Sequence, residues 1–395
     1  MPRYESLSAL IERANDWLAR NPDCEAATCE GVECATTTGH VETETMTVFG
    51  GRTPAAYIRC LRLWLRRRND PREPPQQLGH ANFVPDVVDG TSLRSPKFQP
   101  ISSMVEKTNG MLRKNPLPGK IITIETQEMK LGTYTGELDP DQSFRVEGAV
   151  EKKHFVFVIR IFYEAGIGKG EEIGLVDFGP LCEGSGDVSR LPKGEKFSSL
   201  VGRMSAWYQG QSSVRITNVQ SLEYELESGE VDTRRTFYAG RGDVTTQCVR
   251  MLRVAYVGAA EAPLVPRAVA CRTFVPVQLD RGGCYRSLEY EGMSKTRERI
   301  AAWMRVTGAK LISAETSVMR MHSGGEREKM GPEATHASDS GREAVRFTPR
   351  VSRQGVVEHW IYVIRLYLDG DYQEPDPGLL PPVPPIRDDS CCGIL

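Results

Sequence analysis

Apolar residues recur at helical spacing in four separate stretches of the chain. In the first stretch, ALIERANDWLARNP, Leu10, Ile11, Ala14, Trp17 and Leu18 fall on one side of a helix, and the charged residues fall on the other. Comparable stretches are SMVEKTNGMLRKNP, LVGRMSAWYQGQS and RERIAAWMRVTG. Each stretch therefore predicts an amphipathic helix with one buried stripe.

The four predicted helices are evenly spaced along the chain. Trp17, Met111, Trp207 and Trp303 take the same position in the aligned stretches, at separations of 94, 96 and 96 residues. A constant interval between similar segments indicates internal repetition. The sequence therefore predicts four units of roughly 95 residues each.

Each predicted helix is followed by Pro, Gly or Ser and then by segments with β-strand character. The first segments of the four units are EAATCEGVECATT, KIITIETQEMKLG, VRITNVQSLEYEL and AKLISAETSVMRM. The last segments are AYIRCLRLWLRR, HFVFVIRIFYEAG, TQCVRMLRVAYVG and HWIYVIRLYLDG. A shorter strand such as ETETMTV stands between them in the first unit. The predicted unit is α-β-β-β, and the predicted fold class is α+β, with one helix packed on a small antiparallel sheet in each unit.

The last segment of each unit is apolar on both faces. One amphipathic helix covers only one face of a small sheet, so the other face needs a second partner. Two arrangements are open, two pairs of units or one array of four, and we expect pairs. The predicted ranges are 1–70, 98–166, 195–259 and 285–370 for the four units, 322–345 for a long mobile insertion in the fourth unit, and 371–395 for a Pro-rich tail.

An arginine recurs at one position of the last segment in every unit, among apolar residues where an unpaired charge is costly. The arginines are Arg62, Arg160, Arg253 and Arg365. Acceptors occur at a matching position of the first segment. The acceptors are Glu30, Glu125, Gln220 and Glu315. A cross-strand bond would satisfy both groups, and we favour this structural role. The alternative is an anion site repeated around a groove.

Composition and charge narrow the class of protein. The chain of 395 residues has 50 Lys plus Arg against 52 Asp plus Glu, so no overall positive field favours nucleic acid. No apolar run reaches the length of a membrane-spanning helix, and the first residues lack the apolar core of a secretory signal. We therefore expect a cytoplasmic protein whose 10 cysteines are free thiols, without nucleic-acid partners.

Short strings that resemble catalytic or ligand-binding motifs are incomplete. GIGKGEEIG departs from the spacing of a dinucleotide-binding loop, and DFG at 177–179 has no companion kinase motifs. Cys24, Cys29, Cys34 and His40 do not have the spacing of a zinc knuckle. The sequence therefore predicts no catalytic residue, no metal site and no cofactor.

The tail carries two short motifs in a Pro-rich, extended segment. Pro382, Pro385 and Arg387 satisfy P-x-x-P-x-R, which binds the aromatic groove of SH3 domains, and a stiff linker is the alternative. The ending C-G-I-L from Cys392 fits C-a-a-X, in which the cysteine is prenylated, and Cys391 could carry a second lipid chain. A prenylated form would lie at the cytoplasmic face of a membrane.

Three functions are compatible with these features. The first is a non-enzymatic binding or scaffold protein with protein partners, among them an SH3 domain, and with a membrane surface reached through the lipid anchor. The second is a soluble carrier of a small apolar or anionic ligand at the interfaces between units. The third is an enzyme with a site at such an interface, and we rank the three in this order.

Overall fold

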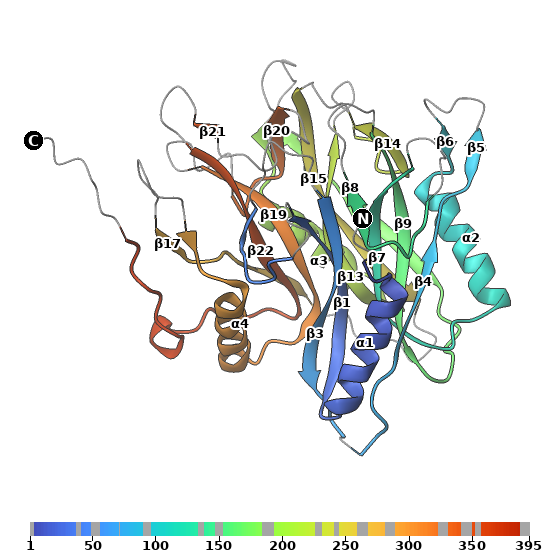
Figure 1. The fold of residues 1–395 in the computed structure, drawn as a ribbon, viewed down its shortest axis with the longest axis horizontal. Coiled ribbons are helices and arrows are strands. Elements are labelled where there is room, and N and C mark those ends of the chain that lie inside the picture. Colours follow the sequence, from blue (N-terminus) through green and yellow to red (C-terminus); the bar gives the residue numbers. More distant parts are fainter. Residues whose placement is uncertain are drawn as a thin grey trace, which may run out of the picture.

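The computed structural model shows a mixed α+β chain with four α-helices and several small antiparallel sheets in its described part (Figure 1). It describes residues 4–36, 41–48, 56–70, 72–89, 96–132, 138–146, 153–183, 193–225, 231–240, 245–258, 268–280, 289–322, 331–340, 350–351 and 357–387.

The helices are those predicted from the apolar spacing. They are α1 (Leu7–Arg20), α2 (Ile101–Lys114), α3 (Phe197–Gln209) and α4 (Met293–Thr307). Helix α1 begins where the Ser6 side chain accepts a hydrogen bond from the Ala9 N–H, and α4 ends at Gly308, whose left-handed φ of 63° suits glycine. In Figure 1, α1, α2 and α4 lie on the outside of the strands. No helix of the described residues is long and apolar enough to cross a membrane.

Two long antiparallel strands follow each helix. The pairs are β1 (Cys24–Thr36) with β3 (Ala56–Arg67), β7 (Gly119–Lys130) with β9 (Lys153–Ala165), β13 (Val214–Glu225) with β15 (Thr245–Gly258), and β19 (Leu311–His322) with β22 (Val357–Asp369). We call each helix with its two long strands a set, numbered one to four along the chain. In every set the recurring arginine lies opposite its predicted acceptor.

Short strands connect each set to the one before it. They are β2 (Thr47–Val48), which pairs with β22, β8 (Phe144–Val146) with β3, β14 (Phe237–Gly240) with β9, and β20 (His336–Ser340) with β15. The long first strands also contact one another, β1 with β7, β7 with β13, β13 with β19, and β19 with β1.

The sets therefore follow one another in cyclic order, and each contacts two neighbours. This differs from the expected association in pairs, because each short strand is hydrogen-bonded to another set and not to its own. The predicted mobile insertion at 322–345 also differs in part, since residues 336–340 form strand β20.

Three further strands lie between the sets, in segments outside the predicted ranges of the four units. They are β4 (Leu78–Phe83), which pairs with β9, β10 (Ile173–Phe178) with β15, and β16 (Val269–Phe274) with β22. Each pairs with the last strand of the following set, on the edge opposite the first strand.

The remaining elements are small and peripheral. They are β5 (Val87–Asp89) with β6 (Lys97–Phe98), β11 (Cys182–Glu183) with β12 (Lys193–Gly194), β17 (Gln278–Asp280) with β18 (Glu289–Tyr290), β21 (Arg350–Val351) beside β22, and the 3-10 turn η2 (Pro377–Leu379).

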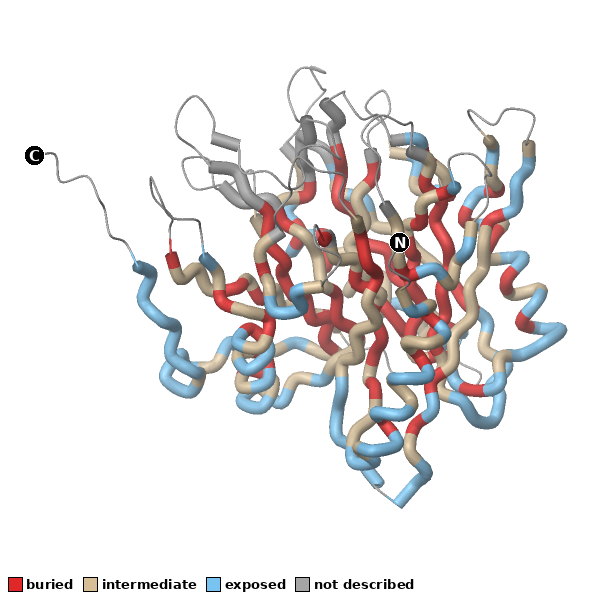
Figure 2. Tube along the Cα trace, in the orientation of Figure 1, coloured by how far each residue is buried: buried red, intermediate tan, exposed pale blue. Residues whose placement is uncertain are grey.

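The core lies along the long strands, as Figure 2 shows by the buried segments at the centre and the exposed helix faces and tail. Each helix buries one apolar stripe, for example Leu7, Ile11 and Leu18 of α1. The opposite faces of the long strands meet neighbouring sets, and this provides the second cover that strands apolar on both faces require.

Candidate functional site

Arg160 of the second set is completely enclosed. Its side chain is 0% exposed, and its Nη1 lies 3.4 Å from Glu125 Oε1. Its Nε donates to Asn82 Oδ1 at 2.7 Å, and its Nη2 donates to the Pro140 carbonyl at 2.8 Å. Burial lowers the pKa of Arg160 to about 10, so the guanidinium keeps its charge at neutral pH. This arginine therefore binds the protein's own groups.

The arginines of the third and fourth sets are equally buried, at 1% and 0% exposed side chain. Arg253 forms two bonds of 2.8 Å with the carboxylate of Asp177 in β10, and these raise its pKa although burial acts in the opposite direction. Arg365 donates to Ser221 Oγ at 2.9 Å and lies 3.7 Å from the centre of the Phe197 ring. Neither arginine presents its guanidinium to solvent.

The acceptors opposite these arginines also join neighbouring sets. Glu125 accepts from the Gly31 N–H at 2.9 Å, Gln220 from the Thr126 N–H at 2.7 Å, and Glu315 from the Ser221 N–H at 2.7 Å. Glu30 accepts in the same way from the Thr316 N–H, which connects the fourth set to the first. In each case the donor belongs to the preceding set and is the residue directly after the acceptor of that set. Gly31, for example, follows Glu30. This geometry supports the structural role of the arginines and acceptors.

Arg62 of the first set differs from the other three arginines. Its side chain is 25% exposed, and its Nη1 lies 3.9 Å from Glu30 Oε2, beyond hydrogen-bond distance. It also donates to the Thr316 hydroxyl. Burial raises the pKa of Glu30, and the charge of Arg62 offsets part of that shift. The first set therefore has an arginine that is partly exposed to solvent.

The strand that carries Arg62 has an open edge at residues 61–66. Strand β3 pairs with β1 on one edge, and on the other edge it pairs with β8 only through residues 56–58. Among the described residues, no strand pairs with residues 61–66 on that second edge. On the matching edges of the other sets, β9 pairs with β4, β15 with β10, and β22 with β16. The side chains are correspondingly exposed, since Leu65 is 43% exposed whereas the matching Leu368 of β22 is 1% exposed.

A cavity of about 440 Å³ lies between α1 and the open edge. Its apolar lining includes Trp17 from α1 and Leu61 and Leu63 from β3, and its polar lining includes Arg13 and Arg59. Trp17 is 38% exposed, while the matching Trp303 of α4 is 1% exposed. The cavity and the open edge together form the candidate site.

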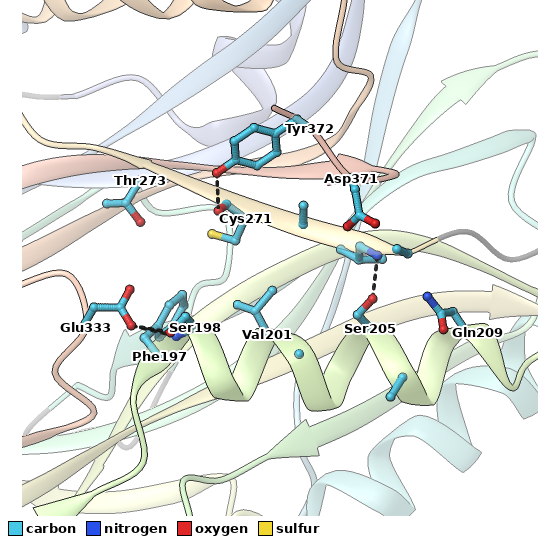
Figure 3. A pocket seen from close by; sticks show the side chains of 15 residues that line it. Phe197, Ser198, Val201, Ser205, Gln209, Cys271, Thr273, Glu333, Asp371 and Tyr372 are labelled. Atoms are coloured by element: carbon cyan, nitrogen blue, oxygen red, sulfur yellow. Dashed lines mark hydrogen bonds between the residues drawn. The ribbon is translucent and has the colours of Figure 1, made fainter. Parts of the chain in front are cut away.

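A second cavity, of about 520 Å³, lies between α3 and β16, and it shows how a helix lies beside a strand that comes between two sets (Figure 3). The Ser205 hydroxyl of α3 accepts a hydrogen bond from the Val269 N–H at 2.8 Å. On the other side, the Tyr372 hydroxyl donates to the Cys271 carbonyl at 3.3 Å. Here β16 pairs with one edge of β22, and the matching edge of β3 is open.

Two cysteines lie next to Arg62 on the long strands of the first set. A hydrogen bond from Cys34 lowers the pKa of Cys60 to about 7, and the positive charge of Arg62 acts in the same direction, against the effect of burial. The pKa of Cys34 is raised by the same hydrogen bond. Cys60 is therefore the more acidic thiol of the pair. Cys60 also lines the cavity between α1 and β3.

The tail residues of the predicted SH3 motif are exposed, but Arg387 has partners within the chain. Its Nη2 lies 2.5 Å from Glu289 Oε2, and its backbone N–H donates to the Leu279 carbonyl at 2.9 Å. Pro382 and Pro385 are exposed and have no regular secondary structure. The predicted lipid sites, Cys391 and Cys392, lie outside the described residues.

The open edge was missed at the sequence level, although the sequence contains a signal for it. The strands β4, β10 and β16 read LGHANF, IGLVDF and VACRTF, and each begins with an apolar residue and ends with Phe. These segments precede the second, third and fourth sets.

Within the described part of the chain, no group of three or more His, Cys, Asp and Glu side chains is placed to hold a metal ion.

Comparisons with protein-family models, with curated proteins and with solved structures found no match to this chain.

Proposed function

We propose that this chain is a non-enzymatic binding or scaffold protein, formed by four copies of one α-β-β-β unit in cyclic order. Its binding site is the cavity between α1 and β3 together with the open edge of β3. The corresponding surfaces of the other three units are covered by the chain's own strands. The first unit is therefore the place where this scaffold has room for a partner.

The observation that carries this proposal is the difference between Arg62 and the other three arginines. The side chains of Arg160, Arg253 and Arg365 are at most 1% exposed, while that of Arg62 is 25% exposed. A charged group next to apolar surface and to a free strand edge suits protein recognition, because an added strand supplies backbone hydrogen bonds and side-chain pockets give specificity.

A matched pair of variants tests the proposal. Leu63→Pro removes a backbone N–H from the open edge, and Val88→Lys changes an apolar residue of β5 that is 69% exposed. We expect a partner that binds wild type and Val88→Lys but not Leu63→Pro, and that keeps this pattern when both proteins are purified. Equal binding to all three proteins would move the site elsewhere on the molecule and contradict the proposal.

A carrier of a small apolar ligand is the second candidate, and the lining of the cavity by Trp17, Leu61 and Leu63 favours it. A hydrophobic dye tests this function directly. Dye fluorescence that rises with wild type and falls in Trp17→Ala, with no protein partner competing for the site, would favour the carrier over the scaffold.

The membrane tether and the location at the cytoplasmic face of a membrane belong to the same proposal, and they rest on the sequence around Cys392 alone. Intact mass and membrane fractionation of the full-length protein from eukaryotic cells, beside Cys392→Ser and Cys391→Ser, test them. A gain of one prenyl group that disappears in Cys392→Ser would support the tether, and an unmodified protein would remove it.

A further inference from the structure

The three strands that cover the edges of β9, β15 and β22 follow one pattern. In β4, β10 and β16, position one is Leu, Ile or Val, position five is Asn, Asp or Thr, and position six is Phe. All three pair antiparallel in one register, so that position five lies opposite the recurring arginine. The edge that is open in β3 is therefore paired with a strand in each of the other three sets.

Position five contacts the arginine in two of these examples. Arg160 donates to Asn82 at 2.7 Å, and Arg253 forms two bonds of 2.8 Å with Asp177. Asn82 and Asp177 are the fifth residues of β4 and β10. Among the residues that the structure describes, none takes this place opposite the partly exposed Arg62, and its Nη1 lies 3.9 Å from Glu30 Oε2. An incoming carboxylate at position five would give Arg62 the partner that Arg253 has.

Position six packs against the helix of the set that the strand covers. The Phe178 ring lies 5.9 Å from the ring of Trp207, and the Phe274 ring lies 5.6 Å from that of Trp303, both edge to face. Trp17 holds the matching position in α1, lines the cavity and is 38% exposed. A phenylalanine at position six of an incoming strand would therefore enter the cavity beside Trp17.

Position two is limited in size by the residue opposite it. A Cβ on Gly79 would lie 2.3 Å from the Tyr163 ring, and one on Gly174 would lie 2.2 Å from the Tyr256 ring. In β16 this position is Ala270, and the residue opposite is Leu368. The matching residue of β3 is Leu65, so Gly or Ala fits at position two of an incoming strand.

We propose that the open edge of β3 binds an extended segment of a partner protein with the pattern apolar, Gly or Ala, any residue, any residue, Asp or Asn, Phe. The segment pairs antiparallel with residues 61–66, with position five opposite Arg62 and position six opposite Leu61. This inference rests on the proposed binding function and specifies the ligand of the same site.

The backbone of β3 is oriented to accept such a strand. The Arg59 N–H donates to the Ser143 carbonyl on the β8 side, and N–H directions alternate along a strand, so Leu61, Leu63 and Leu65 point their N–H groups to the open edge. On the matching edges the Ala165 N–H donates to Gln77 at 2.7 Å and the Gly258 N–H donates to Glu172 at 3.0 Å. Leu63→Pro therefore removes a donor that an incoming strand needs.

The start of the incoming strand offers a gain-of-function test. Asn15 of α1 forms two hydrogen bonds with the backbone of Leu78 at position one of β4, and Asn109 of α2 does the same with Ile173. In both cases the helix belongs to the set before the one that the strand covers. For a strand at β3 of the first set, the preceding set in the cyclic order is the fourth. The matching residue of its helix α4 is Ala301, whose side chain has no polar group. Ala301→Asn should add these two bonds and tighten the binding of a correct peptide.

The first experiment uses a fluorescent peptide with the sequence of residues 172–179, EIGLVDFG, and the full-length protein. Anisotropy should show binding that weakens about tenfold or more when Phe is changed to Ala in the peptide and about tenfold when Asp is changed to Ala. Arg62→Met should lower the affinity for the Asp peptide but leave that for the Ala peptide unchanged. Ala301→Asn should tighten binding, and Val88→Lys should change nothing. Circular dichroism and melting temperature show that each variant is folded.

A peptide library separates failure of the ligand pattern from failure of the binding function. Random peptides displayed on phage are selected on wild type and counter-selected on Leu63→Pro. Enriched peptides with Asp or Asn followed by Phe support the inference. Enriched peptides that lack this pair overturn the inference and leave the binding function in place. If no peptide depends on the open edge and EIGLVDFG does not bind, both are overturned.

Discussion

The carboxylate of Glu30 accepts hydrogen bonds from the backbone N–H and the hydroxyl of Thr316, although the two residues are 286 positions apart in the chain. The same type of bond connects Glu125 with Gly31 and Glu315 with Ser221 over 94 positions. Glu30 therefore closes the cyclic order that the other contacts build step by step. Closure brings α4 and the fourth set beside β3, where the open edge lies.

The buried arginines should contribute much more to stability than Arg62. Arg160→Met leaves Glu125 buried without its cation and Asn82 without a donor, so we expect a loss of about 3–5 kcal/mol in the free energy of unfolding. Arg62→Met removes a partly exposed charge 3.9 Å from its carboxylate and should cost about 1 kcal/mol or less. Urea unfolding of both variants measures the difference. Equal losses would show that exposure does not distinguish the two sites.

The sequence predicts the helices and the long strands well because their patterns are long. Fourteen residues of α1 with one apolar stripe and the recurring arginine in a long apolar strand define both the elements and their register. The short strands were only partly predictable. The predicted segment ETETMTV contains β2 (Thr47–Val48), but the sequence did not show that only two of its residues pair, or that they pair with β22 of another set. The expectation of pairs arose because sequence patterns show that a face needs cover but not which set covers it.

The candidate site was only partly accessible from the sequence. The arginine and acceptor positions were found because they recur, but all four looked alike. The difference between Arg62 and Arg253 lies in a neighbouring strand, since Asp177 of β10 covers Arg253 and no described strand covers Arg62. The six-residue pattern that ends in Phe could have been found by aligning the segments before each set.

The contact between the first and fourth sets should depend on pH through Glu44. Its carboxylate accepts from the Ser294 N–H at 2.9 Å and from the Ser294 hydroxyl at 2.7 Å at the start of α4, and the backbone bond in particular lowers its pKa below the ordinary 4.5. The unfolded chain then binds a proton more readily than the folded chain. Stability from this group is therefore present above pH 4.5 and is lost as pH falls through the lowered pKa.

Glu44→Gln keeps an acceptor for Ser294 but removes the charge, so it should lower the free energy of unfolding by about 0.5 kcal/mol at pH 7 and make stability less dependent on pH below 4.5. Chemical unfolding between acidic and neutral pH measures both effects. Glu42→Gln, which changes an exposed carboxylate in the same segment, is the control. If the pH dependence of Glu44→Gln matches that of wild type, the capping bond does not cause it.

Cys60 should be the most readily alkylated of the cysteines near the candidate site. Its pKa of about 7 predicts that half of it is thiolate near neutral pH, whereas burial raises the pKa of Cys29 and keeps that thiol protonated. The rate of reaction with iodoacetamide, followed by peptide mass spectrometry, should reach half its maximum near pH 7. Cys34→Ala removes the hydrogen bond and should move this midpoint upward. A midpoint near the ordinary 9.0 in wild type would contradict the assignment.

The tail should bind an SH3 domain more tightly when Arg387 is released from Glu289. The predicted motif needs the Arg387 guanidinium for an acidic pocket, and the 2.5 Å ion pair with Glu289 occupies it. Glu289→Gln weakens this pair and should raise the affinity of the full-length protein for a purified SH3 domain by a few-fold, because the exposed ion pair is worth at most about 1 kcal/mol.

Isothermal titration calorimetry with one SH3 domain measures this effect, and two further variants determine its origin. Pro382→Ala should abolish binding in both the wild-type and the Glu289→Gln backgrounds, because the proline fills the aromatic groove. Lys295→Gln, which breaks an exposed pair with Glu298 in α4, should leave the affinity unchanged. If Glu289→Gln lowers the affinity, or if Pro382→Ala has no effect, the segment acts as a stiff linker, and the Arg387 contacts serve to hold the tail against β17.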